Sequence, residues 1–161
     1  MALSPAQKTT LKAAIDGNPT WAAFPMSGDG YYDLARLLSN EIANPAFIVW
    51  RSNVTRTQAS ANMDWTRVDN LSVGKARIWE WMFNAGTINV GDSTIRAGID
   101  AAWVGTAADL AVRATVYANS KRSASQIEKI LATGTGSDAA PATMGFEGTI
   151  SDVDVSAARN S

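Results

Sequence analysis

Apolar side chains recur three or four positions apart along most of the first 133 residues, which is the period of an amphipathic helix. Two clear stripes are Tyr31, Leu34, Ala35, Leu38, Ile42 and Ile95, Ile99, Ala102, Trp103. Helix-capping residues and glycines mark the ends of such stretches: Ser4 precedes one that stops at Gly17, and Ser72 precedes one that stops at Gly86. The pattern predicts a mainly α fold, a helical bundle of five to six helices.

The segment 72–85 differs from its neighbours because its apolar residues lie on more than one side of the predicted helix. Such a helix is either the centre of the core or is covered on its second side by another copy of the chain. The second alternative makes this region a subunit interface. Its candidate residues are Trp79, Trp81 and Arg77, together with Arg113 from the later predicted helix over 107–118.

One further apolar run before residue 133, Phe47-Ile48-Val49-Trp50, is short, β-branched and aromatic, which favours an extended form.

The last 28 residues have a different composition. Residues 134–143 are rich in Gly, Ser, Thr and Ala and predict a linker. In 144–150 apolar and polar residues alternate, as in a half-buried β-strand, and 151–159 predicts a last helical turn. This strand pairs either with 47–50, and with 87–90 beside it, or with a sheet edge in another subunit.

We therefore divide the chain into a helical domain (1–133), a linker (134–143) and a C-terminal docking arm (144–161). The arm is extended and contains the short strand. On this interpretation, removing 141–161 leaves the helical fold intact. The candidate partner-binding residues of the arm are Met144, Phe146, Glu147, Ile150, Val153 and Arg159.

Composition narrows the possible chemistry. The 161 residues include no histidine and no cysteine, which excludes Cys–His and Ser–His–Asp nucleophiles, HExxH zinc sites and disulfide frameworks. The Gly134 and Gly136 loop lacks the lysine of a phosphate-binding loop, and carboxylates such as Asp64 and Asp152 stand where helix caps are expected. We predict no enzymatic activity, no catalytic residue, no cofactor and no metal.

The net charge of −1 conceals an uneven distribution. Residues 1–50 carry 3 basic and 4 acidic side chains, 51–131 carry 10 and 7, and 132–161 carry 1 and 4. A basic middle and an acidic tail suit oriented contacts between subunits. No apolar run is long enough for a membrane span and the first residues do not form a signal peptide, so we expect a cytoplasmic place of synthesis and no membrane contact.

A helix-turn-helix DNA-binding protein is an alternative from another class. Ala101, Gly105 and Thr106 have the spacing of two helices that cross closely at a glycine turn. However, the second helix offers chiefly Arg113 to a DNA groove, followed by Lys121 and Arg122 for phosphate.

Three stretches together resemble a family of small proteins encoded among the virion structural genes of tailed bacteriophages and of prophages of Gram-negative bacteria. They are 68–83 (VDNLSVGKARIWEWMF), 96–103 (RAGIDAAW) and 132–137 (ATGTGS) with 146–149 (FEGT). The likeness extends from Leu3 to Arg159 and contains no enzymatic motif.

The resemblance implies a structural protein of the virion. Its size and helical character favour a head–tail adaptor, or connector, which forms a ring beneath the portal protein. The implied partners are the portal, neighbouring copies in a dodecameric ring, and the next tail component, such as a nozzle or tail-completion protein. DNA would pass through the lumen without sequence-specific binding. A capsid decoration or minor tail protein is the alternative within the same setting.

Overall fold

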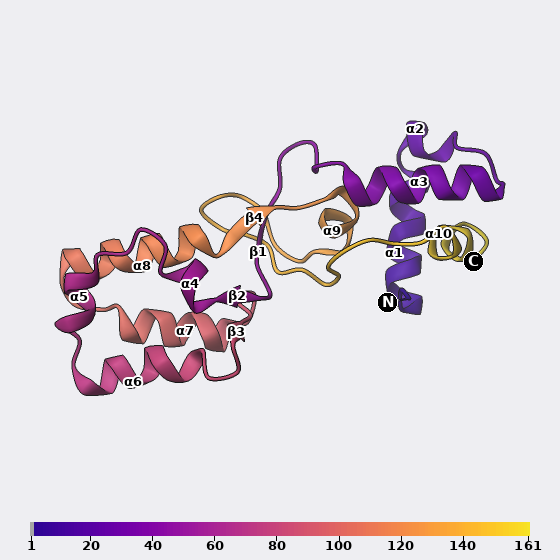
Figure 1. Ribbon diagram of the computed structural model, residues 1–161. Coiled ribbons are helices and arrows are strands. Elements are labelled where there is room, and N and C mark those ends of the chain that lie inside the picture. Colours follow the sequence, from indigo (N-terminus) through magenta and orange to yellow (C-terminus); the bar gives the residue numbers. More distant parts are fainter. Residues whose placement is uncertain (1) are drawn as a thin grey trace. The chain divides into compact units, whose positions relative to one another are not determined.

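The computed structural model describes residues 2–161 and divides the chain into two compact units (Figure 1). Unit 1 comprises Met1–Val49 and Ser123–Ser161, and unit 2 is the uninterrupted segment Trp50–Arg122. About 53% of the chain is helical, which confirms the predicted mainly α class. The described residues form ten helices rather than five or six, because several short turns are helical as well.

Unit 1 is built on four helices that share one core. They are α1 (Pro5–Asp16), α3 (Gly28–Asn40), α9 (Gln126–Leu131) and α10 (Asp152–Arg159), and the short α2 (Pro19–Ala22) follows α1. The predicted start of α1 is confirmed: the Ser4 hydroxyl oxygen accepts a hydrogen bond from the Gln7 amide, and the Gln7 side-chain oxygen accepts one from the Ser4 amide. The core consists chiefly of Leu11, Ile15, Leu34, Leu38, Ile127 and Val155.

The C-terminal residues complete this core. Phe146 and Ile150 are buried within it, and α10 packs against α1 and α3. The Asp154 carboxylate accepts a hydrogen bond of 3.0 Å from the Leu3 amide, so the two ends of the chain are joined. Residues 144–150 contain no strand, contrary to the prediction, and Phe146 and Ile150 instead pack in the core that the helices of unit 1 form.

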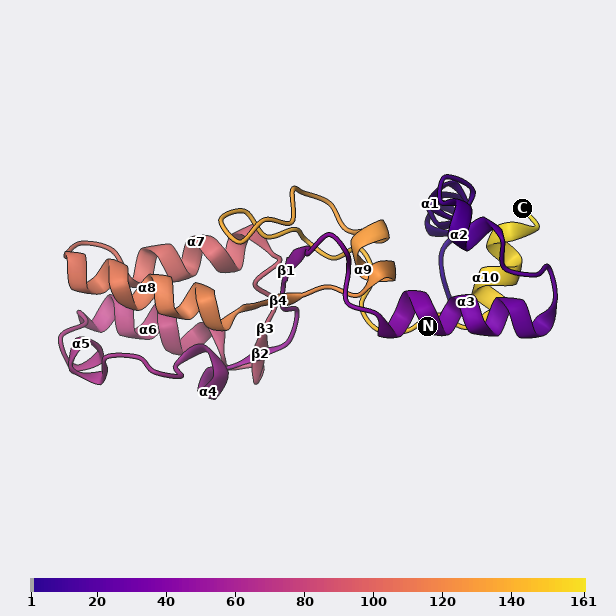
Figure 2. The same cartoon turned by 90° about the horizontal axis from the view of Figure 1, so that it is seen from above.

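Unit 2 contains three longer helices and two short ones. The longer ones, α6 (Val73–Met82), α7 (Ser93–Ala102) and α8 (Ala107–Asn119), lie side by side in both views (Figures 1 and 2). The short ones are α4 (Arg56–Ala59) and α5 (Trp65–Asp69), which both contact α8. A separate core includes Trp79, Phe83, Ile99, Trp103, Val112 and Val116.

Two strand pairs complete the fold. β1 (Ile48–Trp50) pairs with β4 (Lys121–Ser123), and β2 (Val54–Thr55) pairs antiparallel with β3 (Thr87–Ile88), with Val54 opposite Ile88. The extended form predicted for 47–50 is therefore confirmed. Its partner strand is β4 and not the 144–150 segment, for which pairing with 47–50 was one of the two alternatives considered.

Candidate subunit interface

Helix α6 is apolar on two sides, and one side belongs to the core of unit 2. Trp79 is 2% exposed and meets the rings of Phe83 and Trp103 edge-on, with ring centroids 5.1 and 5.4 Å apart. Edge-to-face packing of this kind is favourable beyond the area it buries. Trp79 is thus a core residue and not the interface residue that we predicted.

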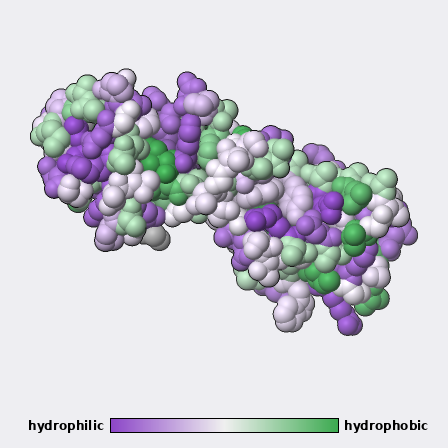
Figure 3. Space-filling model, turned by 180° about the vertical axis from the view of Figure 1, so that it is seen from behind, coloured by the Kyte–Doolittle hydropathy of each residue, from purple (hydrophilic) through white to green (hydrophobic). Residues whose placement is uncertain are grey.

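The second side of α6 is exposed to solvent. Trp81 is 77% exposed, and Val73, four residues before Arg77, is 69% exposed. A groove of about 540 Å³ is lined by Arg77, Ile78, Trp81 and Met82, and we call it the α6 groove. Patches of hydrophobic residues also interrupt the hydrophilic surface in the view from behind (Figure 3). Contiguous exposed apolar surface is typical of interaction sites, which makes the α6 groove the candidate subunit interface.

A glycine on the neighbouring helix shapes this groove. A Cβ atom at Gly98 of α7 would lie 2.7 Å from the Met82 Sδ atom and 3.9 Å from Ile78 Cγ2. The absence of a side chain at Gly98 therefore leaves room for Met82 where α7 packs on α6.

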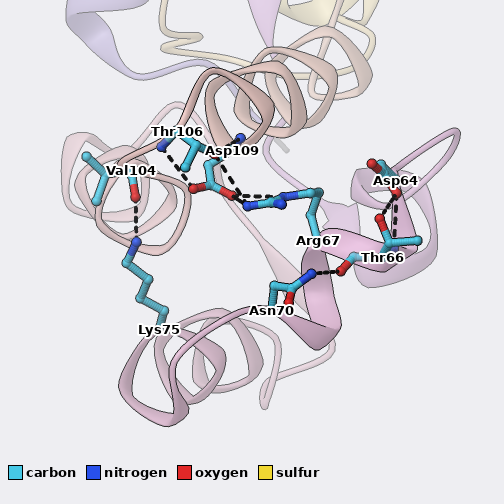
Figure 4. A network of polar contacts seen from close by, with 8 residues as sticks. All are labelled: Asp64, Thr66, Arg67, Asn70, Lys75, Val104, Thr106 and Asp109. Atoms are coloured by element: carbon cyan, nitrogen blue, oxygen red, sulfur yellow. Dashed lines mark hydrogen bonds and ion pairs between the residues drawn. The ribbon is translucent and has the colours of Figure 1, made fainter.

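A polar network connects the helices around α6 (Figure 4). Arg67 on α5 donates from Nε and Nη2 to Asp109 Oδ1, at 3.2 and 2.8 Å, and from Nη2 to the Thr106 hydroxyl at 3.3 Å. The hydrogen bonds from Arg67 and then from the Thr106 amide lower the pKa of Asp109 to about 2. Asp109 also completes the cap of α8, so one carboxylate fixes both α5 and the start of α8.

The start of α6 is attached to the turn between α7 and α8. The Lys75 ammonium group donates a hydrogen bond to the Val104 carbonyl oxygen (Figure 4). In that turn Gly105 has φ 133°, a conformation that favours glycine, and Thr106 caps α8. The turn has the predicted glycine and cap, but α7 packs on α6 and not closely on α8. Arg113, the main cation expected to face DNA, pairs with Asp100 at 3.4 Å.

The four predicted interface residues thus separate into two groups. Arg77 and Trp81 line the α6 groove, whereas Trp79 is in the core and Arg113 is half-buried in its ion pair. The predictions omitted Ile78 and Met82. Their spacing of four residues placed them on one face beside Arg77 and Trp81, and that signal was present in the sequence.

The predicted partner-binding residues of the C-terminus are mostly engaged within unit 1. Phe146 and Ile150 are 9% and 7% exposed. Met144 packs on the small cluster around Val49, and the Arg159 guanidinium donates to the Phe24 and Ala22 carbonyl oxygens at 2.9 and 3.1 Å. Their side chains are therefore part of the fold. Glu147 and Val153 are exposed.

The two units carry opposite net charge. Unit 1 contains 5 basic and 9 acidic side chains, a net charge of −4, and unit 2 contains 9 basic and 6 acidic side chains, a net charge of +3. The cause is the return of the acidic C-terminus to unit 1. Association between an acidic unit of one copy and a basic unit of another is electrostatically favoured.

Among residues 2–161 no three acidic side chains come together as metal ligands would. Within the same residues no helix is both long enough and apolar enough to cross a bilayer. Comparison with protein-family models, with curated proteins and with solved structures finds no significant match to this chain.

Proposed function

We propose that this protein is the head–tail adaptor of a tailed bacteriophage. In this role it forms a dodecameric ring beneath the portal protein and joins the portal to the next tail component. It is assembled in the host cytoplasm, remains in the virion at the head–tail interface, and acts through binding alone, without catalysis.

The observation that carries the proposal is the exposed aromatic and basic face of α6 in a chain whose two units have opposite charge. Trp and Arg are the residues that most often dominate the energy of an interface, and Trp81 and Arg77 are both exposed here. Unlike charges on two different surfaces favour a head-to-tail contact, which generates a ring when the rotation between copies closes. The resemblance of 68–83 and 96–103 to phage virion proteins supplies the setting.

The same features suit a ring through which DNA passes. A lumen must not hold DNA tightly, and a chain with a net charge of −1 is not strongly basic as a whole, which disfavours tight binding to the phosphate backbone. Exposed residues such as Glu147 and Val153 would contact the portal, because Phe146 and Ile150 are buried in the core of unit 1.

The test is cryo-electron microscopy of virions from a phage or induced prophage that carries the gene, together with a knockout of the gene complemented in trans. We expect twelve copies at the junction of head and tail, and filled heads without tails in the knockout. Complementation with the wild-type gene is the control for expression, because it should restore tailed particles.

Other outcomes contradict the proposal in distinct ways. Many copies spread over the capsid would identify a decoration protein, and a location further along the tail would identify a minor tail protein. Absence from the virion, combined with duplex DNA binding that falls steeply with salt and is lost in the Arg113→Ala variant, would identify a helix-turn-helix protein.

A further inference from the structure

Unit 1 carries a groove whose chemistry complements the exposed face of α6. The groove has a volume of about 370 Å³ and lies along α3; we call it the acidic groove. Two of its side chains are apolar and half-buried, and two are carboxylates. The lining residues are Phe24, Leu37, Asp33, Glu41, Arg36 and Asn40.

Each surface has a charged side chain without a partner. Within the described residues, Glu41 of the acidic groove and Arg77 of the α6 groove form no side-chain hydrogen bond or ion pair. The other carboxylate of the acidic groove, Asp33, lies 3.7 Å from Arg36 on the same helix. Glu41 and Arg77 are therefore the two charges that association can pair.

The apolar parts also match. Trp81 is the most exposed large apolar side chain of unit 2 among the described residues, at 77%. Burial of a tryptophan removes about 150–250 Å² from water. A groove of about 370 Å³ with Phe24 and Leu37 in its lining is large enough for an indole ring. Ile42, which directly follows Glu41, is 70% exposed and adds apolar surface beside the charge.

We propose that Trp81 of one copy inserts into the acidic groove of a second copy while Arg77 pairs with Glu41 there. The net charges of +3 on unit 2 and −4 on unit 1 orient the encounter in this sense. The contact is heterologous, so every copy offers one α6 face and one acidic groove, and assembly continues until a ring closes. This inference rests on the proposed function in treating self-association as the purpose of the α6 face.

Single substitutions test the two surfaces separately by sedimentation velocity of the full chain. Trp81→Ala removes the aromatic side chain and Glu41→Arg reverses the charge in the groove. We expect each to weaken self-association by at least about 10-fold. The matched controls are Trp65→Ala, which removes another exposed tryptophan of unit 2, and Asp16→Arg, which reverses another exposed acid of unit 1. Both controls should assemble as the wild type does, and circular dichroism verifies that all four variants are folded.

Mixing the two defective variants identifies the head-to-tail arrangement. The Trp81→Ala chain keeps an intact acidic groove and the Glu41→Arg chain keeps an intact α6 face. A mixture can therefore form one native contact, and the two ends that remain free are both defective. We expect a 1:1 dimer that does not grow, although neither variant associates alone. The double charge exchange Arg77→Glu with Glu41→Arg in one chain should restore assembly.

Several results would overturn this contact. A wild-type chain that remains monomeric at about 1 mM has no such interface. Normal assembly of Glu41→Arg, with loss of assembly in Trp81→Ala, would show a two-fold contact between α6 helices instead. A mixture without the 1:1 dimer would also contradict the arrangement. If the dimer forms but virions lack the protein, the proposed contact is supported and the adaptor function is contradicted. If virions contain the ring but Glu41→Arg assembles normally, the adaptor function is supported and the proposed contact is contradicted.

Discussion

The placement of the C-terminus in the core of unit 1 makes a quantitative prediction. Ile150 is 7% exposed, and its amide donates a 3.1 Å hydrogen bond to the Ser39 hydroxyl of α3, so the side chain has a fixed position in the core. Shortening a buried isoleucine to alanine costs about 2–5 kcal/mol, from lost burial and the cavity that remains. Ile150→Ala should therefore remove a large part of the free energy of unfolding of unit 1, which for a domain is about 5–15 kcal/mol in total.

Val153→Ala is the matched control, because Val153 lies three residues later in the chain, in α10, but is 68% exposed. Its effect on the unfolding free energy should be within about 0.5 kcal/mol. At about 4–8 °C per kcal/mol for a unit of this size, Ile150→Ala should lower the Tm of unit 1 by about 10 °C or more. Calorimetry measures the melting temperatures of both variants.

Removal of residues 144–161 extends the same reasoning. It deletes Phe146, Ile150, Val155 and Ala158 from one core. The summed loss of unfolding free energy from these four residues exceeds the free energy of unfolding of unit 1. Hydrogen exchange followed by mass spectrometry should show rapid exchange throughout α1 and α3, while α7, in the separate core of unit 2, stays protected. Persistent protection of α1 in the truncated chain would refute the reasoning and would restore the interpretation of 144–161 as an independent arm.

Three further predictions follow from other parts of the molecule. Trp79→Ala should destabilise unit 2 by about 3–5 kcal/mol in urea unfolding, whereas Trp81→Ala, at an exposed position, should change it by less than about 0.5 kcal/mol; equal effects would contradict the two-sided description of α6. Asp109→Asn should lower the Tm at neutral pH. The pKa of Asp109 in the folded protein, about 2, lies below its ordinary value of 3.8, so the charged carboxylate stabilises the fold above pH 4 and this stabilisation disappears as the pH falls toward 2. The Tm difference between wild type and variant should therefore shrink over that range. A constant difference would exclude a contribution from the charge. Residues 50–122 expressed alone should fold cooperatively, as judged by circular dichroism, because their core includes no residue of unit 1.

The local signals in the sequence were reliable where a cap and a periodic stripe agreed. Ser4 and Ser72 cap α1 and α6 as predicted, and the stripe that contains Ile99 and Trp103 faces the core of unit 2. Such signals depend only on backbone groups within one or two turns, which a single segment determines.

The organisation of the chain into two units could not be predicted from such local signals. The alternation of Met144, Phe146, Gly148 and Ile150 predicted a strand, but Phe146 and Ile150 are buried against helices that lie more than a hundred residues earlier in the chain. A period of two shows only that alternate side chains are buried, not what buries them. The same limit applies to α6, where the pattern showed apolar residues on more than one side but did not reveal that Trp79 faces the core and Trp81 the solvent.

Long-range connectivity also explains why a chain with a net charge of −1 consists of two units with opposite net charge. Along the sequence the two acidic regions stand at opposite ends, and only the return of α10 to α1 and α3 combines them into one unit with a net charge of −4. At physiological salt the Debye length is about 8 Å, so this charge acts at short range, where it favours productive encounters over strong binding. Affinity in the proposed ring must therefore come from the burial of Trp81 and its apolar neighbours. It follows that raising the salt concentration should slow association of the copies far more than it accelerates their dissociation.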